Sequence, residues 1–65
     1  MKIYLQRIRK EKKLSTEQLA KKSGVARSYI QKIEDGGSNP SIAVLCKLAK
    51  ALQIPVYDLF SCEEE

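Results

Sequence analysis

The sequence predicts a small all-α domain built from five helices. Apolar residues recur every three or four positions in most segments, which is the periodicity of helices with one buried face. Capping residues, glycines and prolines separate these segments from one another. With 65 residues, 43% of them hydrophobic, the chain has the composition of one globular domain with a small core. We expect residues 1–61 to form this domain and residues 62–65 to be an acidic, flexible tail.

Two short helices at the centre of the chain are joined by a tight turn. Ser15 is a favourable N-cap, and Gln18 three residues later completes a capping box. The helix that begins at Thr16 ends at Gly24, because glycine readily takes the left-handed conformation of a helix exit. A second periodic run then continues to Glu34. A helix, a short turn and a second helix form the arrangement that presents one helix to the major groove of DNA.

The second of these helices has two faces of different chemistry. Ala26, Ile30 and Ile33 fall on one side, which we expect to be buried, and Tyr29 falls on the border. Arginine and lysine donors suit guanine, glutamine suits adenine, and serine suits base edges or phosphate. An ordinary solvent-exposed helix face would have the same pattern, so both interpretations stay open at this point. The outward side carries Arg27, Ser28, Gln31, Lys32 and Asp35.

The remaining helices are expected to support this pair. The periodicity predicts a first helix from about Ile3 to Lys12 and a fourth over Ile42 to Gln53. Pro55 is expected to occupy the first position of a fifth, short helix that extends to Phe60. Cys46 in the fourth helix is expected to be a small buried hydrophobe. The inward stripe of the fourth helix comprises Ile42, Leu45, Leu48, Ala49 and Leu52.

The central motif resembles the helix-turn-helix of the phage repressor and Cro family, also called the xenobiotic-response-element type. The resemblance extends over about residues 5–60, through IRKEKKLS, IEDG, NPS and the LCKLAKAL run. It implies a lambda-repressor-like fold and sequence-specific binding of double-stranded DNA by a transcriptional regulator with repressor-like features. The residues that match the twenty-residue pattern are Leu19, Ala20, Gly24, Val25, Ile30 and Ile33.

The resemblance assigns expected roles on DNA. The recognition helix, about Arg27 to Glu34, would lie in the major groove with its N-terminal residues deepest. Thr16 stands where the family often has a longer glutamine, and Ala26 stands where it often has a capping serine or threonine, so both positions depart from the pattern. Base contacts are expected from Arg27, Ser28, Lys32, Tyr29 and Gln31. Phosphate contacts are expected from Ser15, Thr16, Asn39 and Ser41, although turn and capping chemistry alone would also explain Asn39 and Ser41.

Arg9 and Glu34 are expected to form a structural pair. Glu34 lies at the C-terminal end of the recognition helix, where the helix dipole disfavours an acid and a basic partner is therefore expected. In the family, an arginine at the position of Arg9 pairs with the glutamate that matches Glu34. The pair would hold the recognition helix against the first helix.

Charge and composition favour a polyanion as the partner. The formal net charge is +4, and all twelve lysines and arginines lie within residues 1–50.

The chain has no histidine, few scattered carboxylates and no glycine-rich phosphate loop, so we predict no enzyme activity, catalytic residue, cofactor or small-molecule ligand. Cys46 and Cys62 form no metal-binding motif. No segment is long and apolar enough to span a membrane, and the N-terminus lacks the pattern of a signal peptide, so a cytoplasmic protein is expected.

The apolar C-terminal segment has two interpretations. It closes the core of a monomer, or it forms part of a homodimer interface, which the family often builds there; the candidate interface residues are Val56, Tyr57 and Phe60. A rival from another functional class is a protein-interaction module of the same fold, antitoxin-like or an adaptor, that holds a partner with this apolar end. Salt dependence separates the two classes, because binding through several phosphates weakens steeply with added salt.

Overall fold

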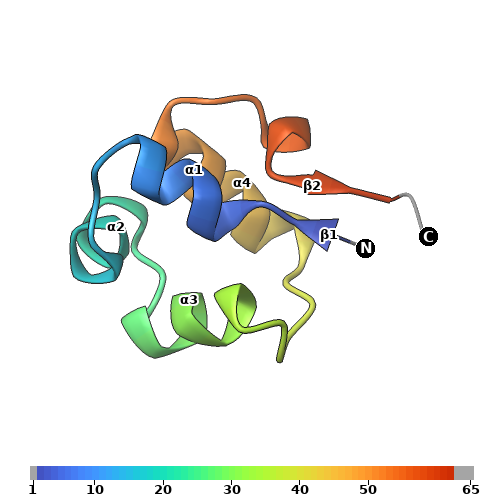
Figure 1. Ribbon diagram of the computed structural model, residues 1–65, viewed down its shortest axis with the longest axis horizontal. Coiled ribbons are helices and arrows are strands. Elements are labelled where there is room, and N and C mark those ends of the chain that lie inside the picture. The colour runs from blue at the N-terminus through green and yellow to red at the C-terminus, as the bar shows by residue number, and fades with distance from the viewer. Residues whose placement is uncertain (1, 63–65) are drawn as a thin grey trace.

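The computed structural model describes residues 2–62, and these residues form four α-helices, a single turn of 3-10 helix and a two-stranded sheet (Figure 1). The expected acidic tail, residues 62–65, lies outside the described residues except for Cys62. Mostly helical structure was predicted correctly. The elements in chain order are β1 (Lys2–Ile3), α1 (Leu5–Glu11), α2 (Thr16–Ser23), α3 (Arg27–Glu34), α4 (Ile42–Leu52), η1 (Val56–Asp58) and β2 (Phe60–Ser61).

The central pair, α2 and α3, forms as its capping residues predict. The Ser15 hydroxyl accepts a hydrogen bond from the backbone of Gln18 at 3.0 Å, and Gln18 Oε1 accepts one from the backbone of Ser15 at 2.9 Å. Gly24 ends α2 in the left-handed region, with φ of 76°, and its N–H donates to the carbonyl of Ala20. That single bond is the αL exit motif, which a residue with a Cβ would enter only with strain.

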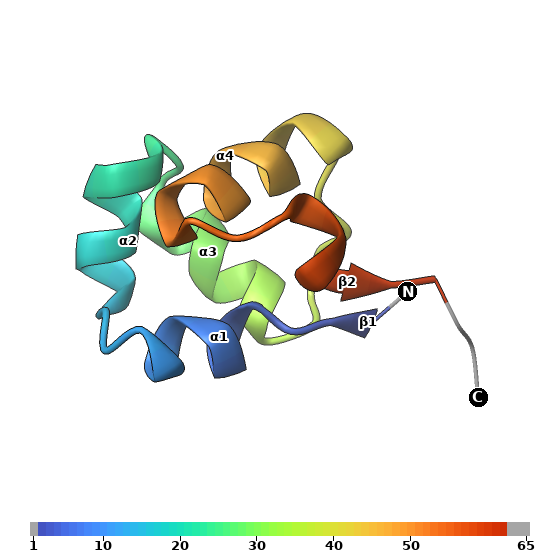
Figure 2. The ribbon, with the colours of Figure 1, turned by 90° about the horizontal axis from the view of Figure 1, so that it is seen from above.

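The core lies where the four helices converge. α2 packs against both α3 and α4, α1 packs against α3, and η1 packs against α4. In Figure 2, α1 and α4 lie on opposite sides of the molecule and α2 closes one end between them. Burial of this apolar set is the main force that holds α3 in place. The buried apolar side chains are Leu5, Ile8, Leu19, Val25, Ile30, Ile33, Leu45, Leu48, Ala49, Leu52 and Leu59.

The two ends of the described chain meet in a sheet that the periodicity did not predict. Strands β1 and β2 pair antiparallel with Ile3 opposite Phe60, and the N–H of Tyr4 donates to the carbonyl of Leu59 at 2.7 Å. The first helix therefore begins at Leu5 rather than Ile3. The expected fifth α-helix is also shorter than predicted: Pro55 is its N-cap in an extended conformation, and only the 3-10 turn η1 follows before β2.

Three helices end in the same hydrogen-bonded motif, and two of them do so without glycine. At the end of α1, Leu14 N–H donates to the Arg9 carbonyl and Lys13 N–H to the Lys10 carbonyl. The end of α4 has the same two hydrogen bonds at the corresponding positions, with Gln53 as its left-handed residue. This is the Schellman motif, in which the left-handed residue is usually glycine. Lys13 has φ of 60° and Gln53 φ of 61°, whereas α3 uses Gly36.

Three burial predictions were wrong. Cys46 is exposed, and it lies beside the inward stripe of α4 rather than on it. Ile42 is 59% exposed although it falls on that stripe, because it is the first residue of α4 and the buried part of the stripe begins one turn later, at Leu45. Ala26 is exposed because it is the N-cap of α3 and so precedes the helix.

Within residues 2–62, no helix is long and apolar enough to cross a membrane.

Candidate nucleic-acid interface

The two faces of α3 differ in burial as their chemistry predicts. Ile30 is 0% exposed and Ile33 2% exposed, so the apolar face is fully committed to the core. The opposite face is open to solvent, and its side chains line one shallow hollow: Arg27, Ser28, Gln31, Lys32 and Asp35. Four of these five residues carry hydrogen-bond donors. An exposed helix that presents donors in this way has the size and chemistry to enter a major groove.

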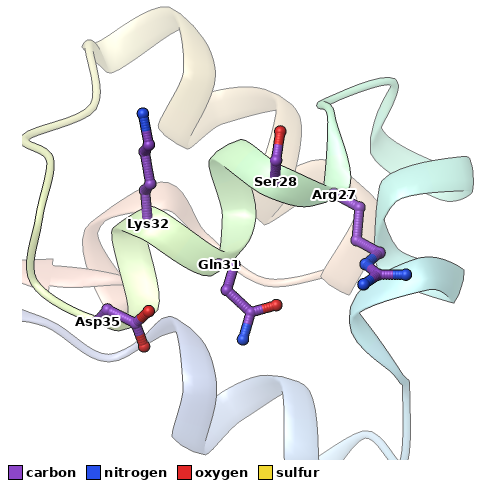
Figure 3. A pocket seen from close by; sticks show the side chains of 5 residues that line it. All are labelled: Arg27, Ser28, Gln31, Lys32 and Asp35. Carbon is purple, nitrogen blue, oxygen red and sulfur yellow. The ribbon is translucent and has the colours of Figure 1, made fainter.

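The five side chains form two rows along α3 (Figure 3). Arg27, Gln31 and Asp35 are spaced four residues apart and follow one another along one side of the exposed face, whereas Ser28 and Lys32 form the second row. Residues at i and i+4 share a helix face, although each step of four residues turns by about 40° around the axis, so each row follows a gentle spiral along the exposed face. The types of side chain that could read bases therefore follow one another in a defined order along the helix axis.

A buried ion pair fixes the C-terminal end of α3. Arg9 Nε donates to Glu34 Oε2 at 2.7 Å, and a second guanidinium nitrogen of Arg9 donates to Oε1 at 3.1 Å. The remaining guanidinium nitrogen donates to the carbonyl of Leu14 at 2.8 Å. The side chains are only 10% and 2% exposed. The pair with Glu34 joins α1 to α3, as the resemblance implies, and the bond to Leu14 adds the turn that follows α1.

At its other end, α3 begins without a side-chain cap. Ala26, the N-cap, makes no side-chain hydrogen bond, so the first amides of α3 receive no acceptor from it. Tyr29 is half-buried and packs against the core, which agrees with its expected place on the border between the two faces. Its ring therefore has less freedom to reach DNA than the exposed side chains of Arg27 and Ser28.

The residues expected to contact phosphate lie at two helix starts that flank α3 in the sequence. The Ser15 hydroxyl already accepts the capping bond of α2, and Thr16, the first residue of α2, is half-buried. The Ser41 hydroxyl accepts a hydrogen bond from the backbone of Val44 at 3.3 Å and caps α4, while Asn39 is exposed in the preceding loop. Both serines therefore have structural roles, which leaves their hydroxyl protons free to donate to a phosphate.

The apolar residues at the C-terminal end are mostly used within the chain. Leu59 is 0% exposed, and Ile54, Val56 and Phe60 are partly buried against the core. Tyr57 is the exception, with 68% of its surface exposed. Of the three candidate dimer residues, Tyr57 thus presents the largest uncovered apolar surface, and Val56 and Phe60 can contribute only their exposed edges.

Neither cysteine has a partner that would make it a site. Cys46 and Cys62 are both free and exposed. Across residues 2–62, no group of three or more metal-ligating side chains converges.

A helix-turn-helix family model matches residues 5–59, which is most of the chain. The chain belongs to this helix-turn-helix family (HTH_3). Its solved neighbours share the fold closely. The restriction-modification controller protein C.AhdI of Aeromonas hydrophila superposes with a TM-score of 0.83 at 45% identity, covering 86% of this chain and 85% of that one. An HTH_3 family transcriptional regulator of Vibrio cholerae gives a TM-score of 0.78 at 36% identity, covering 80% and 29%.

Similar proteins of known sequence bear the names of regulators. SlrR of Bacillus subtilis, an HTH-type transcriptional regulator, is 45% identical over 56 residues, which are 85% of this chain and 37% of that protein. SinR of the same organism is 40% identical over 62 residues, covering 94% and 56%. The immunity repressor protein of Bacillus phage phi105 is 49% identical over 49 residues, covering 75% and 34%. The chain thus spans between about a third and just over half of these proteins. The similarity to phage repressors is confirmed, and the names fit a DNA-binding regulator rather than an enzyme.

Proposed function

We propose that this helix-turn-helix chain is the sequence-specific, double-stranded DNA-binding domain of a transcriptional regulator. Residues Arg27 to Glu34 form its recognition helix in the major groove. The observation that carries the proposal is the contrast between the two faces of α3: Ile30 and Ile33 are buried, while four donor-bearing side chains are exposed on the opposite face. The Arg9–Glu34 pair supports the proposal because it makes α3 a rigid part of the fold. A rigid reading surface loses little conformational entropy on binding.

The chain acts on DNA as a symmetric dimer that binds an inverted repeat. Two recognition helices related by a two-fold axis read half-sites about one helical turn, roughly 34 Å, apart. Base contacts come from Arg27, Ser28, Gln31 and Lys32, with Tyr29 at the edge. Phosphate contacts come from Ser15, Thr16, Asn39 and Ser41. The exposed Tyr57, with the edges of Val56 and Phe60, supplies the dimer contact.

A salt titration of duplex binding, with sedimentation to determine the oligomeric state, tests this function. Each phosphate that a lysine or arginine neutralises lowers the slope of log K against log salt by about 0.9, so DNA binding by this basic chain should give a clearly negative slope. A slope near zero, with firm binding to an apolar protein partner, would instead support the protein-interaction module. The exposure of Tyr57 is the one observation that favours this second candidate.

A further inference from the structure

The exposed face of α3 contains one acidic side chain, that of Asp35, at a position that helix stability disfavours. Asp35 follows the last residue of α3 and serves as its C-cap. The C-terminal end of a helix carries partial negative charge, so a carboxylate there is locally unfavourable. The neighbouring Glu34 is compensated by Arg9, but Asp35 makes no side-chain hydrogen bond and no ion pair with any residue in the described part of the chain.

Asp35 also lies in the row that is proposed to read bases. It follows Arg27 and Gln31 at the same four-residue spacing and lines the same hollow (Figure 3). An unpaired carboxylate on a surface that approaches DNA is repelled by every phosphate. Its favourable partners in the major groove are base amino groups, and an acidic side chain suits the N4 amino group of cytosine in particular.

We propose that Asp35 is a specificity-determining residue that selects a cytosine in each half-site. This inference rests on the proposed function of α3. The carboxylate accepts a hydrogen bond from cytosine N4 on the correct sequence, whereas on other sequences its repulsion from phosphate is uncompensated. Asp35 therefore strengthens binding to the correct site and weakens binding to all other DNA, and the difference between these two affinities is the specificity.

The geometry of the row fixes the side of the guanine on which that cytosine lies. Arg27 and Asp35 are eight residues apart, so about 12 Å of helix axis separates them. The cytosine therefore lies beyond the guanine assigned to Arg27, on the side toward which the C-terminal end of α3 points. Gln31 lies midway, so the row predicts guanine, then adenine, then cytosine as the preferred bases in order along the half-site.

Selection of bound duplexes from a random pool, by the native chain and by Asp35→Asn in parallel, tests the inference. Asparagine has almost the same shape but carries no charge and pairs with adenine, so the preference at that one position is expected to change from cytosine to adenine. Binding to unrelated DNA is expected to strengthen because a repulsive charge is removed. Cytosine enrichment at that position is expected to fall about tenfold, with unchanged preference at the Arg27 position.

Two other outcomes overturn different claims. If the native chain enriches a sequence and Asp35→Asn enriches the same one, with only a uniform gain in affinity, Asp35 does not read a base and the inference fails while the proposed function stands. If the native chain enriches no sequence, the proposed function itself fails. Because Asp35 is exposed and its charge is unfavourable at the end of α3, the thermal unfolding midpoint of Asp35→Asn should equal or slightly exceed that of the native chain, which verifies that the variant is folded.

Discussion

Arg9 and Glu34 lie 25 positions apart in the sequence and form a two-point ion pair, 2.7 and 3.1 Å long, between the first helix and the end of the recognition helix. Since the third guanidinium nitrogen binds the Leu14 carbonyl, the arginine satisfies three acceptors at once. The pair therefore explains how an acid is tolerated at the unfavourable end of α3. It also links the orientation of α3 to the packing of α1.

Truncation of one partner should destabilise the fold strongly. Arg9→Ala leaves the Glu34 carboxylate, only 2% exposed, without a counter-charge, so we expect the free energy of unfolding to fall by roughly 3–5 kcal/mol. Denaturant unfolding followed by circular dichroism measures this change. The double variant Arg9→Met/Glu34→Met is the matched control and should recover most of the loss, because no charge remains buried. A loss below about 1 kcal/mol for Arg9→Ala would show that solvent screens the pair.

The left-handed residues at the ends of α2 and α4 predict two substitutions with opposite effects on the stability of the fold. Gln53→Gly should stabilise the chain by up to about 1 kcal/mol, because glycine takes the left-handed conformation at φ of 61° without the strain of a side chain. Gly24→Ala should destabilise it by about 1–2 kcal/mol, and since no atom lies within 4 Å of the added Cβ, the cost is one of backbone conformation alone. Thermal unfolding compares the two variants with the native chain, and equal midpoints for all three would contradict this account.

Arg27 is expected to read a base. Arg27→Ala should lose about 1–3 kcal/mol of discrimination at a single base pair, while its affinity for a site already mutated at that pair changes little. Binding of the native and variant chains to both duplexes measures this coupling. Lys50→Ala is the charge-matched control, because Lys50 is exposed on α4 and does not line the hollow on α3. Equal weakening of Arg27→Ala on every duplex would make Arg27 a phosphate contact instead.

Tyr57 is the residue on which the proposed dimer depends most. Tyr57→Glu places a charge in a surface that is 68% exposed in the isolated chain, so folding should be unaffected while dimerisation weakens. If Tyr57 is a hot spot of the interface, its loss should cost about 2 kcal/mol or more, which corresponds to at least about a thirtyfold increase in the dimer dissociation constant. Sedimentation equilibrium measures that constant. An unchanged dimer would place the interface on another surface.

The sequence predicts the central motif well because its signals are local. The capping box of Ser15 and Gln18 and the left-handed Gly24 depend on residues a few positions apart, and both were found as expected. The inward positions of Ile30 and Ile33 followed from periodicity in the same way, whereas Ala26 was wrongly placed with them. Arg9 and Glu34 are distant in sequence, and only the resemblance to a known family linked them.

The errors arise where the outcome depends on distant partners. Residues Lys2–Ile3 form a strand because Phe60–Ser61 lies beside them, and two-residue strands have no period to detect. Lys13 and Gln53 end their helices without the glycine that marks such a position. Periodicity assigned Ile42 to the correct stripe, but it cannot show how far along α4 the neighbouring elements reach. Asp35 was placed on the outward face of α3, but its lack of a partner becomes visible only in the structure.

The central claim is that α3 reads DNA sequence, and selection of duplexes bound by the native chain from a random pool at physiological salt tests it most directly. The account predicts enrichment of an inverted repeat whose half-sites lie about one helical turn apart, each containing a guanine for Arg27. Recovery of the pool without enrichment, by a chain that is folded and binds DNA equally on all sequences, would contradict it.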